Sequence, residues 1–263
     1  MLRHKNRVVI LSIASLFAPW IHGQSGSRPS DPSDTSTSKT VADLVRIHNA
    51  WGSRASTPNT SLVIKESGRS GQIIAFRLYA EGVAKDKAYS LLAWPVTQKG
   101  PSKVLSGVTL DASGLAICAG TPGTCGSADK PNDPIDLKLR PVPGEPVRLG
   151  LISEDGATKV FAKVVPIPLR GEDRGCVVEG VLLTPGAELV LIEGSGFPAN
   201  SDLMMDSDSE GEHHEGKAKA DQDGSYTAAV LPYKEGPVHG TLKATLKSAG
   251  CSPSVEVPWG RHN

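Results

Sequence analysis

Short segments in which apolar and polar residues alternate follow one another from about residue 60 to the end of the chain. Between residues 72 and 81 every second position is apolar, as in Ile74, Phe76, Leu78 and Ala80. The same alternation returns near the C-terminus, at Leu242, Ala244 and Leu246. A period of two is that of a β-strand with one buried and one solvated face. Because glycine- and proline-rich turns separate many such segments, the sequence predicts an all-β chain packed as β-sandwiches.

The length of this β-rich part, together with one break in it, predicts two domains. About 205 residues are available for folding, which is enough for two domains of about 100 residues each. Residues 166–175 contain two prolines and four charged residues, a composition typical of a domain boundary. We therefore expect one sandwich over residues 58–165, a linker over 166–175 and a second sandwich over 176–263.

The first residues have the layout of a secretory signal peptide. Three basic residues, Arg3, Lys5 and Arg7, precede an apolar run over residues 8–17, and small residues follow near position 24. The apolar run is about half as long as the roughly 20 residues that a membrane-spanning helix needs. We expect residues 1–23 to be removed on export. The mature chain would then be secreted or periplasmic, with no membrane span.

The stretch between the expected cleavage point and the first strand, residues 24–57, divides in two by composition. Residues 24–40 carry no large apolar side chain and cannot bury enough surface to offset the entropy of ordering. We expect them to form a flexible tether. From Val41 to Trp51 the apolar residues recur at helical spacing, which favours a short amphipathic helix, with an irregular lead-in as the alternative.

The charge balance argues against two classes of partner. The chain has 28 basic and 28 acidic residues, and removal of residues 1–23 takes away three basic ones and leaves a net charge of −3. Nucleic-acid-binding proteins carry a basic footprint, and proteins held on anionic membranes carry a polybasic patch. Neither feature is present, so we expect a protein or cell-surface partner and no nucleic acid.

The four cysteines indicate two disulfide bonds, because an even number in an exported chain is typical of a disulfide framework. They are Cys118, Cys125, Cys176 and Cys251. Of the three pairings that four cysteines allow, we favour Cys118–Cys125, which brackets a turn-rich hairpin tip, and Cys176–Cys251, which would tie the first strand of the second domain to its last. A zinc site is the alternative, but neither pair has the close spacing that zinc sites favour.

Two motifs in the second expected domain resemble those of bacterial surface immunoglobulin-like modules. The first is Gly-Ser-Gly-Phe-Pro-Ala-Asn at residues 194–200, and the second is Ala-Asp-Gln-Asp-Gly-Ser-Tyr at residues 220–226. The resemblance covers about residues 176–258 and implies an immunoglobulin-like sandwich. Both motifs are turn chemistry, so they inform on fold and imply no activity. The expected architecture is thus two tandem immunoglobulin-like β-sandwich domains after a signal peptide and flexible tether.

One segment, residues 206–216, gathers five carboxylates and two histidines. Its start resembles an EF-hand calcium loop, with Asp206, Asp208 and Glu210 at the first, third and fifth positions. Lys217 stands where that loop needs a bidentate carboxylate, which excludes a true EF-hand. A looser surface metal site on these three carboxylates is one interpretation. The other is a solvated hairpin tip whose charges protect a sheet edge.

No enzyme motif is present in the sequence, which has no phosphate-binding loop, no dinucleotide fingerprint and no zinc-protease motif. We expect no catalytic residue and no cofactor. Trp51 and Trp94 are candidate ligand residues, because exposed indoles stack on sugar rings, with core packing as the alternative for Trp94. The sequence therefore predicts an exported, non-catalytic binding or structural protein of the cell envelope or surface. The alternative is a carbohydrate- or metal-ion-dependent ligand-binding module.

Overall fold

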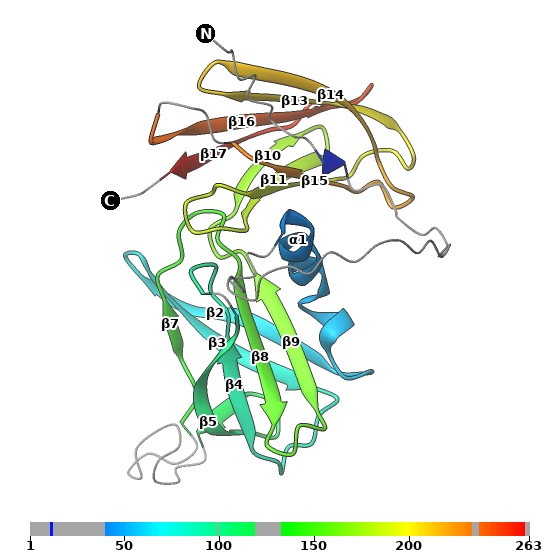
Figure 1. The fold of residues 1–263 in the computed structure, drawn as a ribbon. Coiled ribbons are helices and arrows are strands. Elements are labelled where there is room, and N and C mark those ends of the chain that lie inside the picture. The colour runs from blue at the N-terminus through cyan, green and yellow to red at the C-terminus, as the bar shows by residue number, and fades with distance from the viewer. Residues whose placement is uncertain (1–10, 13–39, 99, 119–132, 233–236, 261–263) are drawn as a thin grey trace, which may run out of the picture.

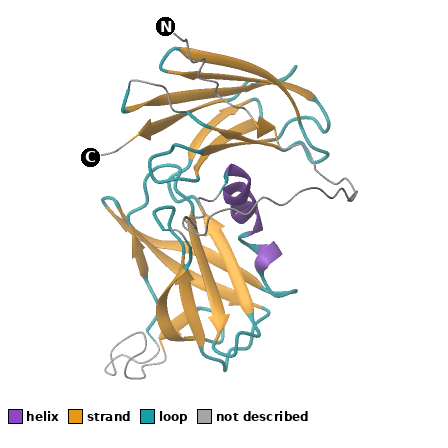
Figure 2. Ribbon diagram, in the orientation of Figure 1, coloured by secondary structure: helices purple, strands orange, loops and turns teal. Residues whose placement is uncertain are grey.

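The structure, a computed structural model, describes residues 11–12, 40–98, 100–118, 133–232 and 237–260. Within these ranges the chain is mostly β-strand, with one α-helix and one short 3-10 turn (Figure 2). The predicted all-β sandwich fold is confirmed. The expected signal peptide and tether fall almost entirely outside the described residues. No helix in the described ranges is long and apolar enough to cross a membrane.

The elements follow one another along the chain as β1 (Leu11–Ser12), α1 (Val41–Ala50), η1 (Ser53–Ala55), β2 (Ser61–Ser70), β3 (Ile73–Glu81), β4 (Tyr89–Ala93), β5 (Ser102–Leu110), β6 (Ala116–Cys118), β7 (Leu137–Leu139), β8 (Val147–Ser153), β9 (Lys159–Val164), β10 (Leu169–Asp173), β11 (Cys176–Leu182), β12 (Val190–Ser195), β13 (Asp202–Ser209), β14 (Glu212–Lys219), β15 (Tyr226–Val230), β16 (His239–Lys247) and β17 (Ser254–Gly260).

Two of the sheets pack face to face as the first sandwich. One has the strand order β2-β3-β7 and the other the order β6-β5-β4-β8-β9, and the paired strands are antiparallel. Their inner faces share one core, in which Leu78, Tyr89, Leu91, Leu149 and Leu151 are fully buried. The alternation in residues 72–81 is the inner face of β3, as the sequence predicts.

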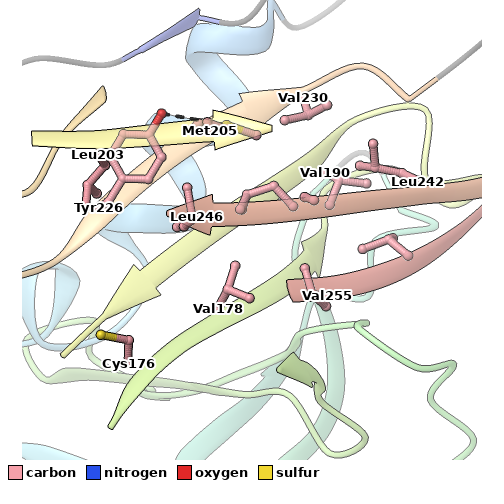
Figure 3. Close-up of a cluster of buried hydrophobic side chains, with 14 of the residues drawn as sticks. Cys176, Val178, Val190, Leu203, Met205, Tyr226, Val230, Leu242, Leu246 and Val255 are labelled. Carbon is pink, nitrogen blue, oxygen red and sulfur yellow. Dashed lines mark hydrogen bonds between the residues drawn. The ribbon is translucent and has the colours of Figure 1, made fainter. Parts of the chain in front are cut away.

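The other two sheets form the second sandwich. Their strand orders are β1-β15-β12-β11-β10 and β14-β13-β16-β17. Val178, Val190 and Tyr226 from the first of these sheets meet Met205 and Leu246 from the second in a continuous apolar core (Figure 3). The Tyr226 hydroxyl lies 3.8 Å from the Met205 sulfur, so the buried phenol retains a polar contact.

Helix α1 lies between the two sandwiches (Figure 1). Thr40 and Asp43 form a capping box at its start, because the Asp43 N–H donates to the Thr40 Oγ1 and the Thr40 N–H donates to the Asp43 carboxylate. Its apolar side packs on the outer face of the β11-β12-β15 sheet, where Val45 joins a small cluster with Leu191 and Ala229. The helix expected from the spacing after Val41 is present, and it covers a sheet of the second sandwich.

The structure corrects the expectation that residues 166–175 are a linker. Leu169–Asp173 is strand β10, which pairs antiparallel with β11 at the edge of the sheet. Its inward-facing middle residue is Gly171, where an added Cβ would lie 1.7 Å from the Ser254 carbonyl oxygen. The two prolines that favour a linker precede the strand, and the charged residues Arg170 and Glu172 take its exposed positions. The lack of a side chain at Gly171 allows β10 to close against β17.

Candidate functional site

The acidic segment is a hairpin, because strands β13 and β14 run through it and leave only a tight turn at Glu210 and Gly211. In this register Asp206 stands opposite Glu215, and Asp208 stands opposite His213. These side chains lie on the face of the sheet that points away from the sandwich core, since the alternate residues of β13 are buried. The charged segment therefore forms both the tip of the hairpin and part of the outer face of the sheet.

Three side chains on this surface come close enough to share one metal ion. Among the described residues, ligand atoms of Asp206, His213 and Glu215 lie within 4.8 Å of one another. The His213 Nδ1 is 3.2 Å from the Asp206 carboxylate, and the Nε2 is 3.8 Å from the Glu215 carboxylate. Lys247 also donates to Asp206 at 2.7 Å, and this hydrogen bond raises the pKa of Lys247. The Lys247 ammonium group therefore already occupies one of the two carboxylate oxygens of Asp206.

The structure does not gather the three carboxylates of the calcium hypothesis. The Asp208 carboxylate accepts a hydrogen bond from the Gly211 N–H at 3.2 Å, which stabilises the turn. The Glu210 carboxylate accepts one from the Thr241 N–H at 2.8 Å, and its backbone has a φ of 51°. Both groups act as turn and edge caps, and only Asp206 of the predicted set joins the cluster with His213 and Glu215.

Sequence reasoning did not place His213 and Glu215 beside Asp206, because their proximity depends on the register of β13 and β14. The period-two pattern of β13 is also hard to recognise, since serines stand where aliphatic residues are usual. Ser207 and Ser209 are buried, with only 2% and 6% of their surface exposed, and they lie on the inner face of β13. Ser209 satisfies its polar group fully, since its Oγ donates to the Pro232 carbonyl at 2.6 Å and accepts from the Trp259 Nε1 at 3.0 Å. A search for period two that counts small polar residues as buried would have found β13.

The two candidate tryptophans form an aromatic cluster on the first sandwich. Trp94 is buried, and its ring lies 5.4 Å from that of Trp51 in an edge-to-face arrangement. Trp51 is half-buried, packs against Phe161 and donates its Nε1 proton to the carbonyls of Leu149 and Ala162. A sugar platform needs exposed ring faces, and this cluster instead docks the chain after α1 onto the sheet.

One of the two favoured disulfides is present. Cys176, at the start of β11, is bonded to Cys251, in the turn before β17. The same edge carries a hydrogen bond from the Ser252 N–H to the Asp173 carboxylate at 2.7 Å. The pairing of Cys118 with Cys125 remains a prediction, because Cys125 lies outside the described residues and Cys118 is buried at their boundary.

A buried polar cluster that no sequence motif announces joins α1 to both sandwiches. His48 of α1 is 1% exposed, and its Nδ1 lies 3.2 Å from the Arg148 Nη2 on β8. Its Nε2 lies 2.7 Å from the Lys163 Nζ on β9 and 3.5 Å from the Glu193 carboxylate on β12. Arginine and the lysine ammonium group can only donate, so both ring nitrogens of His48 face donors, and a neutral imidazole accepts from only one of them.

The environment of this cluster favours neutral His48. Burial lowers the pKa of His48, and the charges of Lys163 and Arg148 lower it further, while the hydrogen bond with Glu193 opposes the shift. Burial likewise lowers the pKa of Lys163. The four groups hold α1 by hydrogen bonds, and none of them lies in an exposed cleft with a candidate nucleophile.

The two motifs at residues 194–200 and 220–226 contact each other. The Phe197 N–H donates to the Gly224 carbonyl at 3.2 Å, and the Asn200 N–H donates to the Asp221 carbonyl at 3.0 Å. Gly224 has a φ of 75°, and a Cβ there would lie 2.1 Å from the Phe197 carbonyl oxygen. These hydrogen bonds between the two motifs therefore hold two loops together at one end of the second sandwich.

Comparison with known proteins gives little. No family model matches the chain, and no curated protein matches it. The solved structures that it resembles include one described as a tetra-tandem repeat in the extending region of a large adhesion protein, with 13% identity over 76% of this chain and a TM-score of 0.26. This match spans about half of that chain, 48%. A TM-score of this size carries no inference about fold or role.

Proposed function

We propose that this chain is an exported, non-catalytic binding or structural module of the cell envelope or surface, located in the periplasm or outside the cell. The observation that carries the proposal is the Cys176–Cys251 disulfide, since such bonds persist in oxidising compartments and are rare in the cytosol. The basic and apolar start of the sequence agrees with export.

We further propose that the two sandwiches are separate domains of immunoglobulin-like type, the first over residues 58–165 and the second over the rest of the chain from about Leu169. Each pair of sheets has its own core, and the two cores share no residue. The two motifs at residues 194–200 and 220–226 support the immunoglobulin-like assignment of the second domain. Hydrogen bonds between them hold two loops together at one end of its sandwich. Strand β10 extends that domain to begin at about Leu169.

The surface best suited to a protein partner is the outer face of the β14-β13-β16-β17 sheet. It presents carboxylates at Asp206 and Glu215 beside lysines at Lys243 and Lys247, so charges of both signs are available for complementary contacts. Every second residue of edge strand β14 is exposed, and most of these residues are charged. Such charges discourage the open edge from pairing with strands of other chains. A flat face with mixed charge favours a binding or structural role over catalysis.

Export and oxidation test this proposal directly. The full chain is expressed in a bacterial host, fractions are separated, and intact mass is measured with and without thiol alkylation. We expect a chain shortened by about 23 residues, outside the cytoplasm, in which Cys176 and Cys251 resist alkylation until reduced. The matched control is Leu11→Arg, which interrupts the apolar run and should keep the chain full-length in the cytoplasm. An uncut wild-type chain with reactive thiols would contradict the proposal.

A second candidate function, metal-ion-dependent binding, is favoured by the Asp206, His213 and Glu215 group alone. Imidazole and carboxylate together suit zinc better than calcium. Zinc is titrated calorimetrically into wild type and into His213→Ala, with Asp208→Ala as the control on the same face. Saturable heat that only His213→Ala removes would support a zinc site. Heat that is absent from the wild type would leave the group as a solvated ion-pair network with Lys247.

A further inference from the structure

Arg148 is a buried cation without an anionic partner. Only 5% of its surface is exposed, and in the part of the chain that the structure describes it is the one arginine, lysine or carboxylate that is buried. Its Nη2 lies 3.2 Å from the His48 Nδ1, its Nε has no hydrogen-bond partner, and none of the described carboxylates forms an ion pair with it. Buried charges are ordinarily paired, because removing an ion from water is costly.

A cavity of about 160 Å³ lies beside this arginine. Its walls come from the end of β4, the end of β7, the loop that follows β7 and the start of β8, and include Ala93, Trp94, Leu139, Pro141, Pro146 and Arg148. The Arg148 guanidinium carbon is 5.6 Å from the centroid of the Trp94 ring, and Trp94 lines the same cavity. The unpaired cation therefore stands at the cavity wall.

The charges around the cavity leave a net positive field. Besides Arg148, the charged residues that line it are the exposed Arg140 and the partly buried Glu145. The Glu145 carboxylate accepts a hydrogen bond from the Val142 N–H at 3.1 Å, and its charge acts on Arg148 from a distance without forming an ion pair. Burial lowers the pKa of Arg148 to about 10, which still leaves it protonated at neutral pH. Two guanidinium groups and one carboxylate leave an excess of one positive charge around the cavity.

The remaining walls are apolar. They consist of prolines, leucine, valine, alanine and the Trp94 indole, and small-molecule sites typically combine such walls with a few polar groups that fix orientation. A protein cavity of about 150 Å³ is known to hold one benzene molecule. The guanidinium offers a planar fork of donors that matches a carboxylate.

We propose that this cavity binds a small carboxylic acid with an apolar body of about six to eight carbon atoms. The carboxylate would accept hydrogen bonds from the part of the Arg148 guanidinium group that lines the cavity, and the apolar body would contact Trp94 and Leu139. This binding site goes beyond the proposed envelope role and does not depend on it.

Benzoate and its uncharged analogue benzyl alcohol test the proposal. Each is titrated into the full chain with its disulfides formed, with heat and Trp fluorescence as readouts. We expect benzoate to bind at least about tenfold more tightly than benzyl alcohol, because a hydrogen bond to a charged group contributes at least that factor. Equal affinities, or no binding of benzoate at millimolar concentration, would overturn the proposal.

Three variants locate the site. Arg148→Met keeps the length of the side chain and should abolish the preference for benzoate over benzyl alcohol. Ala93→Leu fills the cavity and should weaken both ligands at least about tenfold while leaving Arg148 in place. Arg140→Met should retain the preference. If Arg140→Met removes it and Arg148→Met does not, the proposal is wrong, and Ala93→Leu decides the question if Arg148→Met fails to fold.

Discussion

At the scale of single residues, the second sandwich is closed by a position that tolerates no side chain. Gly171 on β10 faces the Ser254 backbone on β17, and this contact joins the edges of the two sheets. The same edge carries the Cys176–Cys251 disulfide and the hydrogen bond between Ser252 and Asp173. Closure of the sandwich thus combines a steric, a covalent and a polar contact within a few residues.

The glycine contact predicts a large effect from one methyl group. Gly171→Ala should lower the free energy of unfolding by about 2–3 kcal/mol, because the new Cβ would lie 1.7 Å from the Ser254 oxygen and the two strands must separate. Gly68→Ala is the matched control, since a Cβ at Gly68 meets no atom within 4 Å, and it should change stability by less than about 0.5 kcal/mol. Urea denaturation measures both, and equal effects would contradict the steric account.

At the scale of secondary-structure elements, α1 does more than lead into the first strand. Its apolar side completes a cluster with Val181, Leu183 and Leu191 on the outer face of β11 and β12. The residues that follow it dock on the other sandwich through Trp51, whose Nε1 reaches the carbonyls of β8 and β9. One ten-residue helix therefore connects two cores that share no side chain.

Docking of α1 can be tested with two neighbouring residues of opposite exposure. Val45→Ala should lower the free energy of unfolding by about 2 kcal/mol, since Val45 is 3% exposed and its truncation leaves a cavity against Leu191. Arg46→Ala removes an exposed ion pair with Asp43 and should cost less than about 0.5 kcal/mol. Denaturant unfolding checks the energies, and limited proteolysis near residue 50 checks whether α1 has loosened. Similar losses for the two variants would contradict docking.

The elements that the sequence predicts are those whose buried face is aliphatic, such as β3 and β16 with their regular leucines and alanines. Strand β10 is not predicted because two prolines precede it, charged residues surround it and its inner middle residue is Gly171. The end of β13 is not predicted because its inner face there consists of Ser207 and Ser209. Asp206 could be proposed as a ligand from the sequence. Its partners could not, because they depend on the strand register. The His48 cluster joins residues that are 100 and 115 positions apart, which no local pattern encodes.

At the scale of the whole molecule, two apolar cores are joined by a polar cluster. His48 meets Arg148 and Lys163 from the first sandwich and Glu193 from the second. Such clusters contribute less net stability than apolar packing of the same volume, but they fix the relative position of the elements that supply them. The second sandwich therefore depends on the redox conditions that preserve its disulfide, and the junction depends on the pH that sets the charge of His48.

The disulfide should dominate the stability of the second sandwich. It closes a loop of 75 residues, which in the chain-entropy model corresponds to about 4 kcal/mol. Cys176→Ser together with Cys251→Ser should therefore lower the free energy of unfolding by about that amount, measured by urea denaturation without reductant. Peptide mapping of the wild type under non-reducing conditions is the control for the pairing. An unchanged denaturation midpoint would refute the assignment.

The junction should weaken on acidification. Burial holds the pKa of His48 below its ordinary value of 6.5, so the unfolded chain binds a proton more readily than the folded one. The stability that neutral His48 provides is complete above pH 6.5 and is lost progressively as the pH falls from 6.5 toward the lower folded-state pKa. The cause is the charge of imidazolium beside Arg148 and Lys163, which Glu193 only partly offsets.

Urea denaturation between pH 8 and pH 5 measures this loss, and hydrogen exchange of α1 locates it. His48→Gln keeps a polar side chain without a titrating group and should flatten the stability profile below pH 6.5. Val45→Ala is the matched control, because it weakens the same packing without changing any charge. It should lower stability at every pH and keep the wild-type slope. A slope that survives in His48→Gln would place the titrating group elsewhere and remove His48 from the junction's response to acid.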